Sequence, residues 1–325
     1  MNFQFKSARE YAGALPTFNT SEIGFFSTDA EERFWDDNRQ MKYIILPSNK
    51  NNVFMDLNEG YDDEIKKVFD KSEDTLYLWI LKHQKEVCDN FRIPNSDKPH
   101  IDFVCYRGLL KTIGSTIYEK KQDWLICATK FNSVIYLCDF RTEDKIENLS
   151  KLTERDKLMI FWGMKFEKYM SANAPDSKPK SSEPVNGREK YFTVLKGRLG
   201  EHTLLYSAEV DGKDPLADAN KPPTECYLEL KTSKMYQDAA ATDNEYRKFC
   251  TLKMRTWWLQ SYLAGIPKVV CGFRDDLGIV RKLGIIPVAD MPNKSMGSLS
   301  PSSPLNAISS FLDHVKKCVI KEAPT

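Results

Sequence analysis

The chain contains 325 residues, which is enough for one large domain or two smaller ones. It is 41% hydrophobic and 29% charged, as expected of a globular protein with a substantial apolar core. The formal net charge is only +1, which excludes a nucleic-acid-binding mode based on overall positive charge, so any such site must be a local basic channel.

Cysteine and histidine spacing gives no indication of a zinc site. The eight cysteines and four histidines are scattered, and no two cysteines have C-x-x-C spacing. The amino-terminal segment has no apolar signal core, and no apolar run approaches 18 residues. The sequence therefore predicts a reducing compartment (cytoplasmic, nuclear or both) and no membrane partner.

The first part of the chain is expected to form one helix and one strand after an irregular start. Residues 1–60 show only short apolar pieces, and the first helix is expected over Asp74–Gln84. The apolar run Ile101–Leu110 is typical of a strand that ends at Arg107 and Gly108. A buried arginine there either forms an ion pair or binds a phosphate, and the sequence alone favours the ion pair.

The middle of the chain contains a helix with a clear start signal. Thr153 and Asp156 form a capping box that predicts a helix as far as Ala172. Gly163 inside it costs about 1 kcal/mol relative to alanine, which indicates close approach by another backbone. Glu167 lies on the flank of this helix and by itself is typical of an exposed acid. The other elements expected here are a loop over 90–98 and strands over Trp124–Lys130 and Ser133–Phe140.

The segment 172–190 is polar and proline-rich, and we interpret it as a surface loop within a single domain that spans 1–325. It is not a convincing domain boundary, because the strands after it are expected to complete the same sheet. The elements expected after it are strands over Tyr191–Leu195, Lys268–Arg274 and Gly278–Val288, helices over Asn244–Ala264 and Leu305–Lys321, and a loop over 293–304.

Two strand-like runs between Leu204 and Lys231 carry the most informative pattern in the chain. Because strand side chains alternate between faces, Glu209 and Asp211 share one face of the first run. Glu229 and Lys231 likewise share one face of the second run. Pairing the two runs as a hairpin would place three carboxylates and one ammonium on the same sheet face.

Three adjacent carboxylates repel each other unless a cation lies between them. Mg²⁺ prefers such oxygen ligands, and two divalent cations can hold a phosphate for in-line displacement. The order Asp, gap, Glu-x-Lys is the D…ExK pattern typical of nucleases, in which the acids hold metal and the lysine orients water or phosphate. The same pattern is more often a solvated sheet face with a cross-strand ion pair, so alone it is a weak indication.

Longer strings surround these residues. They are YRGLL at 106–110, GMKFEKYM at 163–170, GEHTLLYSAEVDG at 200–212, CYLELKTSK at 226–234 and QSYLAGIPKVVCGFR at 260–274. In this order they resemble the signatures of the DXO family. The members of this family are eukaryotic RNA 5′-end decapping exoribonucleases. The family also contains the activating partner of the nuclear 5′–3′ exoribonuclease. The similarity extends from about residue 21 to about residue 280, which makes the set very specific.

The element pattern predicts a mixed α/β fold, and the resemblance implies a large twisted mixed sheet, a smaller sheet and flanking helices. It also implies a role for individual residues. The metal ligands, for two Mg²⁺ or Mn²⁺ ions, would be Glu167, Glu209, Asp211, Glu229 and the carbonyl of Leu230. The catalytic residues would be Lys231, Gln260 and Glu209. The substrate contacts would come from Tyr106, Arg107, Gly108, Phe192, Lys231 and Gln260. Arg33 is offset by one place from a substrate arginine of the family and receives no role.

The resemblance implies a hydrolase that acts on RNA 5′ ends in mRNA quality control. It would remove incomplete, non-canonical or NAD caps and degrade 5′-monophosphate RNA in the 5′→3′ direction. Release of pyrophosphate from triphosphate ends varies across the family. Two alternatives stay open: a weakly catalytic or non-catalytic partner that stabilises the nuclear 5′–3′ exoribonuclease, and a DNA endonuclease of the D…ExK kind.

Overall fold

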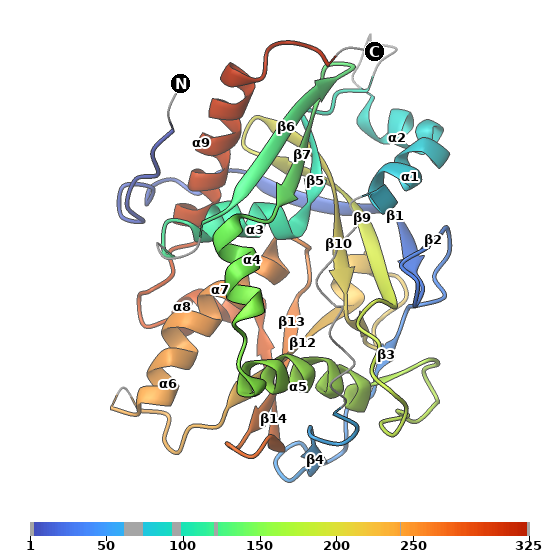
Figure 1. The fold of residues 1–325 in the computed structure, drawn as a ribbon, viewed down its shortest axis with the longest axis vertical. Helices are drawn as coiled ribbons and strands as arrows, with labels where there is room; N and C mark the ends of the chain where they lie inside the picture. The colour runs from blue at the N-terminus through green and yellow to red at the C-terminus, as the bar shows by residue number, and fades with distance from the viewer. Residues whose placement is uncertain (1–2, 62–73, 93–98, 120–122, 241, 324–325) are drawn as a thin grey trace.

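The computed structural model describes residues 3–61, 74–92, 99–119, 123–240 and 242–323. Two seven-stranded sheets form the centre of this part of the chain, and helices pack on their faces (Figure 1). The alternation of strands and helices confirms the predicted mixed α/β class. None of the described helices is both long and apolar enough to cross a membrane.

The first sheet is mixed. Its strands are β1 (Phe18–Thr28), β2 (Phe34–Trp35), β5 (Phe103–Tyr106), β6 (Leu125–Phe131), β7 (Val134–Phe140), β9 (Lys190–Leu199) and β10 (His202–Val210). Their order is β2–β1–β9–β10–β5–β7–β6, with β10 antiparallel to β9 and parallel to β5. The expected irregular start is wrong, because β1 is an 11-residue strand. A register shift between Glu22 and Gly24 breaks its alternation, which hid the strand in the sequence.

The second sheet is also mixed. Its strands are β3 (Tyr43–Ile44), β4 (Met55–Asp56), β8 (Ser171–Ala172), β11 (Gly212–Lys213), β12 (Tyr227–Lys234), β13 (Lys268–Arg274) and β14 (Ile279–Pro287). Their order is β4–β14–β13–β12–β11–β3–β8, with β12 parallel to β13. Four of these strands contain only two residues each, so this is the smaller sheet, as the resemblance implied.

The predicted hairpin between the two acidic runs is wrong. β10 belongs to the first sheet and β12 to the second, so they do not pair with each other. The chain changes sheets after Val210, and Gly212 then pairs with Leu228. A Cβ atom at Gly212 would lie 2.6 Å from Ile44 and 3.0 Å from the carbonyl oxygen of Lys42, so only glycine fits at this crossing.

Nine helices complete the described part of the chain. They are α1 (Asp74–Lys82), α2 (Gln84–Phe91), α3 (Arg107–Ser115), α4 (Glu143–Ser150), α5 (Glu154–Met170), α6 (Asn244–Lys248), α7 (Met254–Tyr262), α8 (Met291–Lys294) and α9 (Ser302–Cys318). The capping box predicted for α5 is present, with Thr153 and Asp156 bonded reciprocally.

Several predicted boundaries need correction. Arg107 begins α3 instead of ending a strand. The single helix expected over 244–264 is divided by a π-helical segment at Phe249–Lys253. The expected loop over 293–304 is shorter, because α8 extends to Lys294 and α9 already begins at Ser302. In the loop expected over 90–98, residues 93–98 lie outside the described residues.

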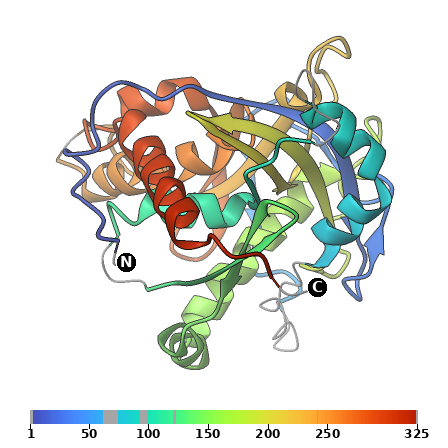
Figure 2. The same ribbon diagram turned by 90° about the horizontal axis from the view of Figure 1, so that it is seen from above.

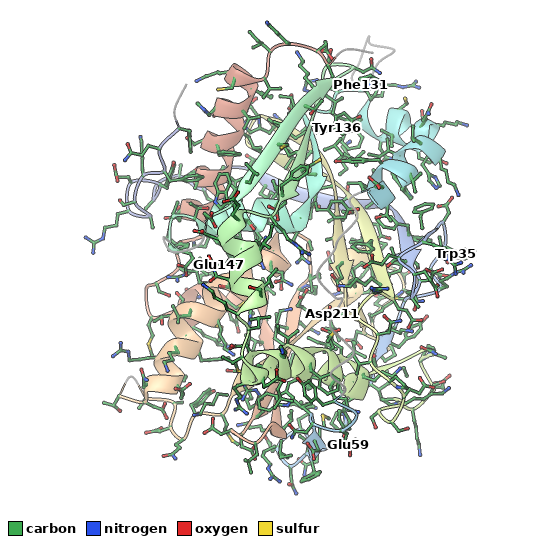
Figure 3. The ribbon with its side chains drawn as sticks, viewed as in Figure 1. Trp35, Glu59, Phe131, Tyr136, Glu147 and Asp211 are labelled. Carbon is green, nitrogen blue, oxygen red and sulfur yellow. The ribbon has the colours of Figure 1, made fainter. Side chains whose placement is uncertain are left out.

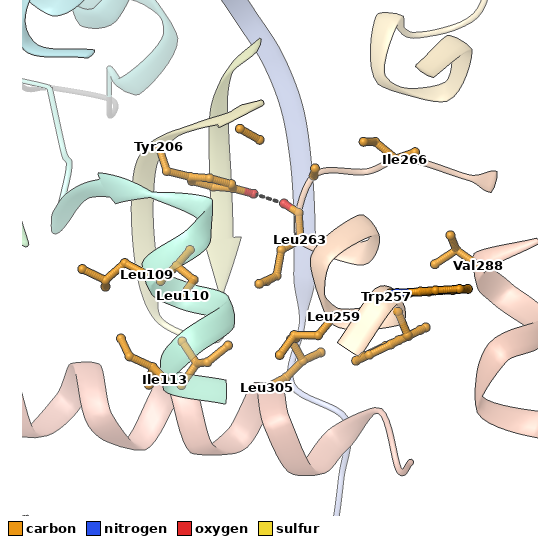
Figure 4. Close-up of a cluster of buried hydrophobic side chains, with 14 of the residues drawn as sticks. Leu109, Leu110, Ile113, Tyr206, Trp257, Leu259, Leu263, Ile266, Val288 and Leu305 are labelled. Atoms are coloured by element: carbon orange, nitrogen blue, oxygen red, sulfur yellow. Dashed lines mark hydrogen bonds between the residues drawn. The ribbon is translucent and has the colours of Figure 1, made fainter. Parts of the chain in front are cut away.

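Alternate residues of β10 contact opposite layers of helices. Tyr206 packs in a cluster with side chains of α3, α7 and α9, and its hydroxyl donates a hydrogen bond of 2.7 Å to the carbonyl of Leu263 (Figure 4). Leu205 packs on the other face with side chains of α1 and α2. Figure 2 shows α9 on one side of the first sheet and α1 and α2 on the other. This arrangement confirms the predicted alternation and fixes the direction of Glu209.

The second sheet lies between two helices. Leu228 and Leu230 of β12 pack with Phe166 of α5, whereas Tyr227 belongs to the cluster that contains α7. Alternation then turns Glu229 toward α7, in agreement with the predicted faces of this strand. The helix α7 therefore reaches both sheets at the place where β10 ends and β12 begins.

Candidate active site

Four acidic side chains gather where the two sheets meet, and we call them the acidic cluster. Glu209 is near the end of β10, and Asp211 follows that strand near the middle of the view in Figure 3. Glu229 comes from β12 and Glu167 from the last turns of α5. The carboxylates of Glu167 and Asp211 each interact electrostatically with other members of the cluster, so three distant parts of the chain (α5, the end of β10 and β12) supply one site.

Glu229 is the most deeply buried member, with 1% of its surface exposed. Its Oε1 accepts a hydrogen bond of 2.5 Å from the Lys231 ammonium and another from the side-chain amide of Gln260. Its Oε2 is buried, and no described residue donates a hydrogen bond to it. A buried carboxylate oxygen without a donor carries a large desolvation cost, which a bound cation would offset.

Two further contacts hold Glu209 and Asp211. The Lys190 ammonium lies 2.7 Å from Oε1 of Glu209. The backbone nitrogen of Leu230 donates a hydrogen bond of 2.7 Å to Oδ2 of Asp211. With both lysines charged, the ionised acidic cluster still carries more negative than positive charge, four carboxylates against two ammonium groups.

The crowding of carboxylates changes their proton affinities. Burial, together with the Glu209 carboxylate, raises the pKa of Glu167 to about 7. Burial and the carboxylate of Glu229 hold the pKa of Asp211 well above its usual range. Burial by itself would lower the pKa of Lys231, but Glu229 and Asp211 raise it above its ordinary value. Lys231 is therefore a charged ammonium at neutral pH.

The donor set fits hard divalent cations. As the side chains stand, no group of three or more acidic, histidine or cysteine residues in the described ranges is placed to hold a metal ion. Lys231, Gln260 and Lys190 hold carboxylate oxygens that an ion would use. The available donors are nonetheless all oxygens, which Mg²⁺ and Mn²⁺ select, and Oε2 of Glu229 is suited to such an ion.

A cleft of about 250 Å³ opens beside the acidic cluster. Glu209 and Gln260 lie in its wall and connect it with Glu229. The substrate residues implied by the resemblance that line it are Tyr106, Arg107, Gly108, Phe192 and Gln260. Its lining contains four basic side chains (Arg107, Lys111, Arg188 and Lys190) and three acidic ones (Glu32, Asp139 and Glu209), and the guanidinium groups suit a ligand that carries phosphate.

Arg107 is buried and joins three parts of the site. Its Nη1 donates a hydrogen bond of 2.7 Å to the carbonyl of Gln260, and its Nη2 donates one of 3.3 Å to the carbonyl of Glu209. Arg107 thus binds two backbone carbonyls, where the sequence alone favoured an ion pair. Since a guanidinium has five N–H groups, donors remain for a ligand in the cleft.

The structure brings all the predicted site residues to one place, while their individual roles stay predictions. Lys231 reaches the site through Glu229 and does not line the cleft. Leu230 is placed by the bond from its nitrogen to Asp211. Arg33, which received no role, is exposed and pairs with Asp29.

Sequence reasoning missed three basic residues of the cleft. Lys190 pairs with Glu209, Lys111 lies 3.5 Å from the Gln260 side chain, and Arg188 comes from the end of the proline-rich loop. Lys190 sits on β9, and only the register of β9 against β10 puts it next to Glu209. No spacing in the sequence encodes that register.

Two mixed sheets with a D…ExK acidic cluster at their junction define a nuclease-type core. A family model described as RAI1 like PD-(D/E)XK nuclease matches residues 19–325. The chain belongs to this family, which confirms the resemblance drawn from the sequence strings.

Known relatives cover nearly the whole chain. The chain is 34% identical to the "Decapping and exoribonuclease protein" of Homo sapiens, over 97% of this chain and 79% of that protein. Two solved structures share the fold. Scheffersomyces stipitis Rai1 in complex with (3′-NADP)⁺ and calcium ion has a TM-score of 0.76 at 21% identity, covering 99% of this chain and 88% of that one. Candida albicans Rai1 in complex with pU5-Mn²⁺ has a TM-score of 0.76 at 18% identity, covering 95% and 84%.

Proposed function

We propose that the protein is a divalent-metal-dependent phosphodiesterase that acts on RNA 5′ ends. It removes incomplete, non-canonical or NAD caps and degrades 5′-monophosphate RNA in the 5′→3′ direction. Its family membership and the human relative named a decapping and exoribonuclease protein support this activity. The similar fungal proteins solved with a pU5–Mn²⁺ complex and with (3′-NADP)⁺ support the substrate classes.

The acidic cluster would hold the divalent ions. Glu167, Glu209, Asp211 and Glu229 would supply carboxylate oxygens, with the carbonyl of Leu230 as a further ligand. When bound, such ions neutralise phosphate charge and lower the pKa of a coordinated water. The oxygen of Glu229 that no described residue donates to is the single observation that most supports this assignment.

Lys231 and Gln260 would position the reacting groups. Both donate to the same oxygen of Glu229, so their head groups converge on one point beside the acidic cluster. Because the pKa of Lys231 is raised, its ammonium does not act as a base at neutral pH. It would instead stabilise the negative charge that develops on the phosphate or orient the attacking water.

The cleft would bind the 5′ nucleotide. Arg107 and the exposed Gly108 at the start of α3 offer N–H groups, and Lys111 and Arg188 add positive charge. Phe192 stacks on Phe26 with ring centres 4.9 Å apart and forms an apolar part of the wall. Phosphate and nucleoside therefore each find matching groups.

The experiment that tests this function uses purified protein with Mn²⁺ and a panel of 5′-end-labelled RNAs. The panel contains capped, NAD-capped, 5′-triphosphate and 5′-monophosphate ends, and the products are identified by mass. We expect release of intact cap or dinucleotide fragments and stepwise loss of nucleotides from the monophosphate end. Cleavage of duplex DNA without attack on any of these RNAs would contradict the proposal.

A further inference from the structure

A second cavity of about 620 Å³ lies beside the cleft, between α3, α4 and α7. Figure 1 shows α4 in front of α3 and α7, below the β6–β7 hairpin. Neither the family resemblance nor the proposed chemistry gives this cavity a role. It is larger than the cleft, and it adjoins the site that is proposed to hold the RNA 5′ end.

The two cavities adjoin each other along α3. Lys111 lines both of them. Arg107 and Gly108, at the start of α3, face the cleft, while Ser115 and Thr116, at its end, face the second cavity. At a rise of about 1.5 Å per residue, this path covers roughly 14 Å. An RNA chain that leaves the cleft past Lys111 would therefore reach the second cavity next.

The size of the cleft favours such an exit. Its 250 Å³ lies below the range of roughly 300–1,000 Å³ for pockets that enclose a drug-sized ligand. We therefore expect the cleft to enclose the 5′-terminal nucleotide, whereas an RNA substrate continues beyond it. The 620 Å³ of the second cavity falls inside that range and suits at least one further nucleotide.

The lining of the second cavity suits bases and riboses. Trp124 and Tyr118 supply aromatic surface, and Leu149 supplies aliphatic surface. The guanidinium of Arg255 lies 4.3 Å from the centre of the Tyr118 ring, so its plane adds a surface on which a base can stack. Asn148 offers amide groups that can bond base edges or a 2′-hydroxyl.

The charges of the lining favour RNA over a purely phosphate ligand. The basic residues Lys111, Lys145 and Arg255 are balanced by the acidic residues Glu119, Asp123 and Asp144. Equal numbers of opposite charges give little attraction for phosphate alone, so stacking and hydrogen bonds must provide the affinity. Lys111, at the junction, is the basic side chain placed to meet the phosphate between the two nucleotides.

We propose that the second cavity binds the nucleotides that follow the 5′-terminal one, so that single-stranded RNA runs from the cleft over Lys111 and along α3. This inference rests on the proposed function for the identity of the ligand. It adds a downstream RNA-binding site and predicts that affinity depends on the length of the RNA. The cavity takes these nucleotides through their bases and riboses, with little preference for sequence.

Binding without cleavage tests this inference separately from catalysis. Fluorescence anisotropy is measured in EDTA with 3′-labelled 5′-monophosphate oligouridylates of two and eight nucleotides. Asn148→Trp fills the cavity from α4, and Thr256→Trp fills it from α7. Ser150→Trp is the matched control, because Ser150 is exposed on α4 and does not line the cavity. The helix α4 has no buried residue, so it tolerates a bulky side chain.

We expect the unmodified protein to bind the eight-nucleotide RNA about tenfold more tightly than the two-nucleotide RNA, as one stacked base would give. Asn148→Trp and Thr256→Trp should abolish this difference and leave the affinity for the short RNA within twofold. Ser150→Trp should keep the difference in affinity between the two RNAs. The inference is overturned if neither cavity variant reduces the length dependence, or if the unmodified protein shows no length dependence. If the unmodified protein binds RNA with this length dependence but cleaves none of the RNAs in the Mn²⁺ assay, the proposed function is contradicted and the inference is not.

Discussion

Glu229 combines deep burial with an oxygen that no described residue donates to, and this makes it the member of the acidic cluster on which activity should depend most. Glu229→Gln keeps the size of the side chain and removes the charge that a cation needs. Loss of a residue that only hydrogen-bonds a metal ligand typically reduces metal affinity or activity about 10- to 100-fold. Loss of the ligand Glu229 itself should therefore reduce kcat/KM on 5′-monophosphate RNA by at least about 100-fold. Single-turnover cleavage in Mn²⁺ measures the effect, and wild-type cleavage by the variant would refute the assignment.

Lys231 is predicted to stabilise the metal-free protein. Lys231→Met leaves the buried Glu229 without its 2.5 Å ammonium partner, which should lower the free energy of unfolding by about 3 kcal/mol in EDTA. The double variant Glu229→Gln/Lys231→Met should recover most of this loss, because the uncompensated charge is then absent. Urea denaturation of the four proteins gives the coupling energy. Additive effects of the two substitutions would show that the pair is not coupled.

The pKa of Glu167 predicts how metal binding depends on pH. Its value of about 7, against 4.5 for an ordinary glutamate, means that the metal-free folded state holds a proton that the unfolded state has lost between these pH values. Stability from this group is therefore present below pH 4.5 and falls as the pH rises to 7. Divalent ions displace the proton, so the rise in Tm caused by Mn²⁺ should be small at about pH 5.5 and clearly larger at about pH 8. An equal rise in Tm at both pH values would argue against Glu167 as a ligand.

At the level of elements, the packing of α5 on the second sheet sets the position of Glu167. A Cβ atom at Gly272 would lie 2.6 Å from the ring of Phe166, the residue before Glu167. Gly272→Ala should therefore cost about 1–3 kcal/mol of stability and shift the helix. A displacement of about 1 Å at a catalytic group can reduce the rate about 100-fold, so cleavage should fall together with Tm.

Gly163 on the same helix is the matched control. The sequence predicted a close backbone approach there, but nothing lies within 4 Å of the place its Cβ would occupy, so that expectation is wrong. Gly163→Ala should raise the free energy of unfolding by up to about 1 kcal/mol through helix propensity and leave cleavage unchanged. Thermal melts and RNA cleavage of both alanine variants separate the two cases.

The outcome of the element predictions follows from the range over which sequence patterns act. Local signals identified the capping box of α5 and the bounds of β13. Pairing between distant strands is not a local property, so the sheet change at Gly212 and the long strand β1 were missed. Glu209, Asp211 and Glu229 were nevertheless found, because alternation within each strand fixed their faces whichever sheet each strand joined. Glu167, on a helix, was identified only through the family resemblance. Lys190 was missed, since its contact with Glu209 depends on pairing alone.

At the level of the whole molecule, two sheets and the helix α7 bring together residues that are far apart in sequence. Glu167, Asp211 and Glu229 come from three separate parts of the chain, and Gln260 on α7 joins them through its bond to Glu229. No single motif contains this arrangement, so from the residues alone the D…ExK pattern stayed a weak indication. The family resemblance supplied what the pattern lacked, because it connected the separate strings in a fixed order.

The most direct test of the acidic cluster is a crystal structure of the protein soaked in Mn²⁺, with data collected to show anomalous scattering. If the cluster holds divalent ions, anomalous peaks will lie about 2 Å from carboxylate oxygens of Glu229, Asp211 and Glu167, and none will lie there in crystals of Glu229→Gln. Manganese bound elsewhere, with these carboxylates still engaged only by Lys231, Lys190 and Gln260, would contradict the assignment.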